Sequence, residues 1–147
     1  MLTEYDFNNL MQQLKKFEDD SPIRIPDDGG KITRNLHSEN SHEQFILNIE
    51  RGRIDLKKVK YQARDKATNT VLLRIDTKGP RHLNPDGQFI ECPHIHIYRE
   101  KYGDKWAMPL DSSIFSDFND LGKLLKDFLI YFNVQDIPDI LSVEKMV

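Results

Sequence analysis

The sequence has a single cysteine, Cys92, and no apolar run near the roughly 18 residues that a membrane span requires. One thiol cannot form an internal disulfide, which is typical of proteins from a reducing compartment. The first ten residues, MLTEYDFNNL, carry acidic side chains where a secretory signal peptide has basic and apolar segments. We therefore expect a cytoplasmic protein that makes no contact with the membrane.

Glycine and proline are also scarce, at seven residues each, which excludes collagen-like and low-complexity chains. Hydrophobic residues make up 38% of the chain and charged residues 31%, which is typical of a globular protein. The 147 residues are enough to bury a core without a disulfide or a structural metal. We predict a single domain over residues 1–147.

The net charge of −3 conceals an uneven distribution along the chain. Residues 51–105 contain 13 Lys and Arg against 7 Asp and Glu, whereas the remaining residues contain 8 against 17. A basic centre between acidic ends predicts a face that attracts a polyanion such as RNA. A solvated strand face rich in lysine would give the same pattern without any ligand, so both interpretations stay open.

Hydrophobic spacing predicts a helix at the start of the chain. Apolar residues recur at intervals of three and four from Phe7 to Phe17, which indicates a helix over residues 1–18. The acidic residues that follow and Pro22 would end this helix. Residues 19–43, which contain prolines, glycines and many polar side chains, predict a long, irregular connection with a short strand around residues 31–36.

The rest of the chain predicts a sheet followed by a second helix. Over residues 44–110 apolar and polar side chains alternate in short runs separated by turns, which predicts an antiparallel meander of four or five strands. An apolar stripe then predicts a helix over residues 116–133, with Ser116 or Asp117 as its N-cap. The fold class is therefore α+β, with the C-terminal helix packed on one face of the sheet.

His94 and His96 alternate with Ile95 and Ile97, so both imidazoles should lie on the polar face of one strand. Other polar side chains should lie on the same face. His82, in the loop before this strand, should also reach it. The side chains expected to bind a ligand there are Lys58, Lys60, Arg64, Arg74, Asp76, Arg81 and Tyr98.

Three kinds of chemistry suit this set. In the first, His82, His94 and His96 are catalytic residues of a metal-independent ribonuclease, in which paired imidazoles transfer protons and need no cofactor. In the second, His94 and His96 bind a metal together with His82 or Asp76. In the third, the face binds RNA or a protein without catalysis. Each histidine could equally make ordinary structural hydrogen bonds, so whether the protein is an enzyme stays open.

Two short runs carry a resemblance to known proteins. Leu72-Leu-Arg74-Ile-Asp76 and Pro93-His94-Ile-His96-Ile-Tyr98 resemble segments of short, uncharacterised bacterial and phage-borne proteins. They are also similar to small toxin-like ribonucleases whose sheet carries a proline followed by closely spaced histidines. The resemblance covers residues 70–110 and implies a bacterial or mobile-element protein that engages RNA or another phosphate-bearing ligand. The alternative is a non-catalytic protein-interaction module or inhibitor.

Overall fold

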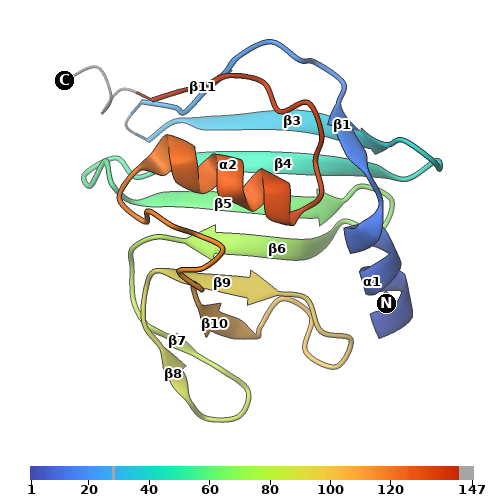
Figure 1. Cartoon of the computed structure of the whole chain (residues 1–147). Helices are drawn as coiled ribbons and strands as arrows, with labels where there is room; N and C mark the ends of the chain where they lie inside the picture. The colour runs from blue at the N-terminus through green and yellow to red at the C-terminus, as the bar shows by residue number, and fades with distance from the viewer. Residues whose placement is uncertain (28, 143–147) are drawn as a thin grey trace.

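The computed structural model describes residues 1–27 and 29–142; Asp28 and residues 143–147 belong to the predicted domain but lie outside the described residues. Its centre is a seven-stranded sheet in the order β1-β3-β4-β5-β6-β9-β10, in which all neighbouring strands are antiparallel (Figure 1). The predicted α+β class is confirmed, and the sheet has more strands than the four or five expected.

The strands of this sheet are β1 (Lys15–Phe17), β3 (Lys31–Ser38), β4 (Gln44–Arg51), β5 (Val59–Asp65), β6 (Thr70–Asp76), β9 (His94–Ile97) and β10 (Ala107–Pro109). The two helices are α1 (Glu4–Gln12) and α2 (Leu121–Tyr131). Two strand pairs lie outside the sheet, the parallel pair β2 (Ile23–Arg24) with β11 (Ile140–Leu141) and the antiparallel hairpin β7 (His82–Leu83) with β8 (Phe89–Ile90). In the described part of the chain, neither helix has the length and apolarity to cross a membrane.

The expected helix over residues 1–18 was wrong in its second half. α1 ends at Gln12, and Lys15–Phe17 form the edge strand β1, paired with β3. The spacing of the last apolar residues fits a strand as well as a helix, and pairing with β3 provides the backbone hydrogen bonds.

Within residues 19–43 the short strand expected around residues 31–36 is confirmed and is longer than expected, because β3 covers Lys31–Ser38. Most side chains of β3 are polar, so its strand pattern is weak, but it pairs with β4 along its length. The second helix begins at Leu121 instead of residue 116. Its N-cap is Asp120, whose carboxylate accepts a hydrogen bond from the Lys123 amide at 3.0 Å.

The core lies between α2 and the face of the sheet that α2 covers (Figure 1). The Phe128 ring packs 6.2 Å from that of Tyr61, and the Phe132 ring packs 5.4 Å from that of Phe45. The Tyr61 hydroxyl, which is buried, donates to the Leu121 carbonyl at 2.8 Å. Helix and sheet are therefore joined by both apolar packing and a buried hydrogen bond.

Both edges of the sheet are occupied by groups from the same chain. On β10, the Asn84 amide donates to the Ala107 carbonyl at 2.8 Å and accepts from the Ala107 amide at 2.9 Å. On β1, the Lys15 amide donates to the Asn133 carbonyl at 3.1 Å, and the Gln135 amide donates to the Lys15 carbonyl at 2.8 Å. The outward backbone groups of Ala107 and Lys15 are therefore satisfied.

Lys15 is fully buried, with a relative exposure of 0%. Its ammonium donates to the carbonyl oxygens of Met11, Gln13 and Phe132 at 3.2, 2.9 and 2.8 Å. It also lies over the Phe45 and Phe132 rings, 5.0 and 4.1 Å from their centroids. Burial lowers the pKa of Lys15 to about 7. This side chain ties the end of α1 to the end of α2.

Candidate metal centre

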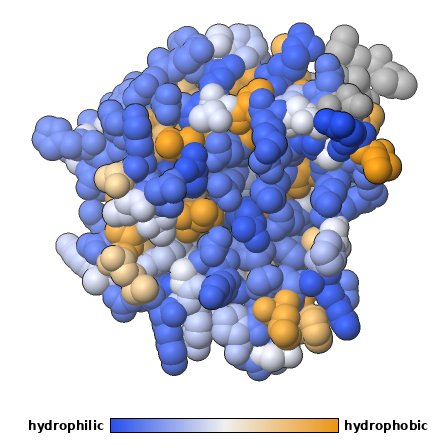
Figure 2. Space-filling view, turned by 180° about the vertical axis from the view of Figure 1, so that it is seen from behind, coloured by the Kyte–Doolittle hydropathy of each residue, from blue (hydrophilic) through white to orange (hydrophobic). Residues whose placement is uncertain are grey.

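The face of the sheet opposite α2 is largely hydrophilic (Figure 2). Strand register aligns its side chains in rows across the sheet, and the two rows that reach β9 are Asn48-Gln62-Arg74-His96 and Glu50-Lys60-Asp76-His94. His94 and His96 thus share a face with Arg74 and Asp76, as the alternation in the sequence suggested. This arrangement brings the acidic, basic and imidazole groups of two neighbouring strands together.

Asp76 and the histidines of β9 form a compact cluster. The Asp76 Oδ2 atom lies 3.5 Å from Nε2 of His94 and 3.4 Å from Nε2 of His96. The ligand atoms of these three residues all lie within 4.8 Å of one another. His82, from the β7–β8 hairpin, places its ring 4.6 Å from that of His96 and 6.1 Å from that of His94. The three histidines predicted to be catalytic, His82, His94 and His96, therefore lie close together and next to Asp76.

The hydrogen bonds of His96 fix its tautomer. Its Nδ1 atom lies 2.8 Å from the Asp104 carbonyl oxygen, which can only accept, so Nδ1 carries the proton. Its Nε2 atom lies 3.0 Å from Nη2 of Arg74, which can only donate, so Nε2 has a lone pair. The closer contact of Nε2, with Arg74, favours a lone pair there over a proton shared with Asp76 at 3.4 Å.

His94 is oriented in the same way. Its Nδ1 atom lies 3.2 Å from the Glu91 carbonyl oxygen and 3.3 Å from that of Ile90, so this nitrogen also carries a proton. In the neutral ring, Nε2 then has a lone pair that faces Asp76. Metal-binding histidines in general donate their second ring N–H to a carbonyl or carboxylate in this way.

Asp76 is ionised. Burial opposes its ionisation, but the guanidinium of Arg74, together with the hydrogen bond that an imidazole of His94 or His96 donates when its Nε2 is protonated, outweighs burial and holds the pKa of Asp76 well below the usual range. The Arg74 Nε atom donates to Asp76 at 3.1 Å. The cluster therefore presents one carboxylate oxygen and two imidazole nitrogens toward a common point.

The separations between these atoms match a metal coordination sphere. Two ligands at about 2.1 Å from a tetrahedral ion lie about 3.4 Å apart, because they span an edge of the tetrahedron. The two distances from Asp76 to the histidines, 3.5 and 3.4 Å, agree with that edge. Two imidazoles and one carboxylate suit zinc, iron and similar divalent ions.

The cluster is accessible to solvent through Asp76 and Arg74 far more than through its histidines. The side chains of His94 and His96 are 3% and 1% exposed, whereas those of Asp76 and Arg74 are 18% and 23% exposed. His82 is half-buried. A small ion or a protruding chemical group can reach this cluster more easily than a large ligand can.

The basic side chains predicted around β5 differ in their distance from the cluster. Lys60 stands opposite Asp76 on the neighbouring strand and also faces Glu50 at 3.7 Å, whereas Arg64 lies further along β5 and donates to Asn48 at 2.9 Å. Lys58 is exposed just before the strand begins. Glu50 thus offsets the charge of Lys60, while the contact of Arg64 with the neutral Asn48 leaves the charge of Arg64 in place.

Two further predicted ligand-binding residues take structural positions. Tyr98 is buried, and its hydroxyl donates to the Leu2 carbonyl at 2.5 Å while its ring lies 5.6 Å from that of Phe7 in α1. Arg81 stacks on the Phe89 ring at 3.8 Å. The strand periodicity placed Tyr98 on the correct face, but it gave no sign that α1 covers that end.

The structure adds residues that sequence reasoning missed. The carbonyl groups of Glu91, Ile90 and Asp104 orient the histidines, and that of Lys105 lies 2.6 Å from Nε2 of His82. Any residue type can supply a carbonyl, so the sequence carries no signal for these contacts. Asp104 also faces Nη1 of Arg74 at 3.5 Å through its carboxylate.

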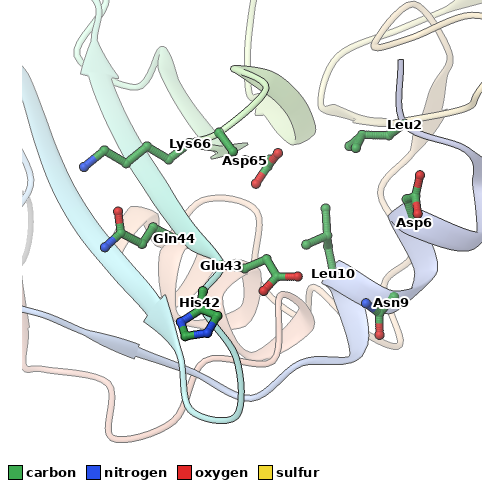
Figure 3. A pocket seen from close by; sticks show the side chains of 10 residues that line it. Leu2, Asp6, Asn9, Leu10, His42, Glu43, Gln44, Asp65 and Lys66 are labelled. Atoms are coloured by element: carbon green, nitrogen blue, oxygen red, sulfur yellow. The ribbon is translucent and has the colours of Figure 1, made fainter.

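A cavity of about 760 Å³ lies elsewhere, beside α1 and the turns that precede β4 and follow β5 (Figure 3). Leu10 and the carboxylates of Asp6, Glu43 and Asp65 lie around it. Glu43 accepts a hydrogen bond from the Ser41 hydroxyl, and Asp65 accepts one from the Thr68 hydroxyl at 2.6 Å. These acids are held by their own turns, and the cavity includes none of the predicted site residues.

The fold and the cluster together define an α+β protein with two histidines and one carboxylate gathered on the face of its sheet opposite α2. A family model described as "Family of unknown function (DUF6978)" matches residues 2–134, and the chain belongs to this family. No curated protein and no solved structure shows significant similarity to the chain. The family carries no statement of activity, so the similarity to toxin-like ribonucleases stays a prediction.

Proposed function

We propose that this protein binds a divalent transition-metal ion through Asp76, His94 and His96. The observation that carries the proposal is the convergence of three potential ligand atoms within 4.8 Å of one another, with Asp76 Oδ2 3.5 and 3.4 Å from Nε2 of His94 and His96 and the far nitrogen of each imidazole facing backbone carbonyls. The ligand set resembles the two-histidine, one-carboxylate arrangement that leaves coordination positions open.

The distances favour a metal over a proton at this point. A charge-assisted hydrogen bond between an imidazolium and a carboxylate is typically about 2.7–2.9 Å long. The two separations at Asp76 are longer than that, and they match an edge of a coordination tetrahedron. A divalent ion would satisfy all three lone pairs at once, provided that Nη2 of Arg74 leaves His96.

Burial favours metal ligation over direct proton transfer to RNA. A general acid or base must come within hydrogen-bond reach of the atom that it serves. His94 and His96 are almost completely enclosed, so a phosphodiester cannot touch them in this arrangement. When bound, a metal with an open coordination position supplies Lewis-acid chemistry and activates water. A substrate would then need to reach only that open position and not the buried histidines.

Metal binding can be measured directly. The protein is treated with a chelator, dialysed and titrated with Co²⁺, whose visible spectrum reports its coordination, and then with Zn²⁺ as a competitor. We expect one equivalent of Co²⁺ to bind and Zn²⁺ to displace it. Zn²⁺ at 100 times its Kd should also stabilise the fold by about 2.7 kcal/mol, seen as a higher Tm.

Variants test which residues bind the ion. Asp76→Asn and His94→Gln should lose at least tenfold in metal affinity, since each removes one ligand. His42→Gln is the matched control, because His42 is exposed and lies outside the cluster. Circular dichroism verifies that each variant is folded. If the wild type binds no metal, or if Asp76→Asn and His42→Gln bind it equally well, the proposal is wrong.

A further inference from the structure

We infer that the metal-loaded centre binds a phosphate group, with the Arg74 guanidinium as its second contact. This inference rests on the proposed metal site and names the class of ligand that would occupy its open side. It is carried by the charge of the cluster, by the position of Arg74 and by the direction from which the cluster is accessible.

The charge of the cluster changes sign when a divalent ion binds. The charged side chains in contact with one another are Asp76, Arg74 and Asp104, and His94 and His96 must be neutral to bind a metal. Two carboxylates and one guanidinium give a net charge of about −1, and a divalent ion brings it to about +1. A partly buried site with net positive charge attracts an anion.

Arg74 is the group that metal binding would free. Its Nε atom donates to Asp76 at 3.1 Å, its Nη1 faces Asp104 at 3.5 Å, and its Nη2 donates to His96 at 3.0 Å. A metal ion that takes the lone pair of His96 removes the acceptor of Nη2, whereas the bond to Asp76 can persist. The guanidinium then has N–H groups available beside the metal, in the fork geometry that binds phosphate well.

The accessible side of the cluster fits a protruding phosphate. Asp104, Arg74 and Asp76 are the most exposed side chains around the cluster. Lys60 stands opposite Asp76 on the neighbouring strand, and 43% of its side chain is exposed. A phosphate oxygen could reach the metal from this side while a second oxygen contacts Arg74. The phosphate of a nucleotide and that of an RNA chain share this chemistry.

The test uses the Co²⁺-loaded wild-type protein and three phosphate probes: inorganic phosphate, a 5′-mononucleotide and a single-stranded oligoribonucleotide. Acetate serves as the non-phosphate anion. We expect each phosphate probe to change the visible Co²⁺ spectrum and acetate to bind at least tenfold more weakly than inorganic phosphate. Tighter binding of the oligoribonucleotide than of the mononucleotide identifies RNA as the source, and equal binding identifies a small phosphate compound.

Variants of Arg74 test the second contact. Arg74→Gln and Arg74→Lys are first titrated with Co²⁺, so that their metal affinity is known, and then with inorganic phosphate. We expect phosphate affinity to fall at least tenfold in Arg74→Gln and less in Arg74→Lys, while Arg53→Gln, an exposed arginine outside the cluster, stays unchanged. If Co²⁺ does not bind the wild type, the metal site itself is wrong. If Co²⁺ binds but phosphate leaves its spectrum unchanged, or acetate binds as tightly as phosphate, only the present inference is overturned.

Discussion

Replacing the buried Lys15 with methionine should remove a strong pH dependence of the stability between pH 7 and pH 9. In the folded protein burial lowers the pKa of Lys15 to about 7, whereas an unfolded chain holds a lysine at its ordinary value of about 10.4. In this window the unfolded chain therefore binds a proton at Lys15 that the folded protein has mostly released. Unfolding takes up a proton, so the free energy of unfolding rises with pH.

The expected size of the effect follows from the two pKa values. Integrating the proton difference from pH 7 to pH 9 gives a gain of about 2 kcal/mol, which is lost again as the pH falls back toward 7. Urea unfolding followed by circular dichroism at pH 7, 8 and 9 measures this slope in the wild type and in Lys15→Met. The slope is the readout, because methionine also leaves the Phe132 carbonyl without its donor and lowers stability at every pH.

The difference between the two slopes isolates Lys15, since the other titrating groups are the same in both proteins. Equal slopes would refute the reasoning. They would mean that the three carbonyl contacts and the two aromatic rings keep the ammonium charged at pH 9 despite its burial.

Three further substitutions test the packing. Phe128→Asp should lower the free energy of unfolding by more than about 4 kcal/mol, because it places an unpaired charge in the core, whereas Phe128→Leu should remain folded. A near-native Tm of the aspartate variant would contradict the packing of α2. Tyr61→Phe should cost about 1 kcal/mol in urea unfolding, since it removes the hydrogen bond to Leu121 and keeps the ring. Asn84→Ala should cost about 2 kcal/mol, because Ala107 loses two partners; an unchanged Tm would show that water replaces them.

Periodicity predicted the elements whose pattern is long enough to be distinctive. The central strands and α2 follow this rule, because each repeats its apolar spacing over seven or more residues. β1 has three residues, so its apolar spacing also fits the end of a helix, and its partner β3 decides between the two. The burial of Lys15 could not be predicted from the sequence either, because it depends on carbonyl groups of Met11, Gln13 and Phe132, which the fold brings together from both ends of the chain.

The site was predictable only as far as strand geometry determines it. Alternation placed His94 and His96 together, and the same rule placed Arg74 and Asp76 on their face. Periodicity cannot give the depth of burial, which depends on the loops that cover the strand ends. It also cannot give a tautomer, because that depends on the carbonyl groups of Glu91 and of other loop residues. The choice between catalytic base and metal ligand therefore needed the structure.

The side chain of Asn84 has a consequence for how the protein behaves at high concentration. An edge strand with unpaired N–H and C=O groups is a template on which a strand of another molecule can add. On β10 the Asn84 amide makes the pair of hydrogen bonds that such a strand would make with Ala107, while Pro109 offers no N–H at all. The opposite edge, at Lys15, is occupied by residues 133–135. At Ala107 and Lys15 the two edges of this seven-stranded sheet are thus blocked to an added strand without the closure of a barrel, and loss of the Asn84 amide would free the groups of Ala107 to pair with another molecule.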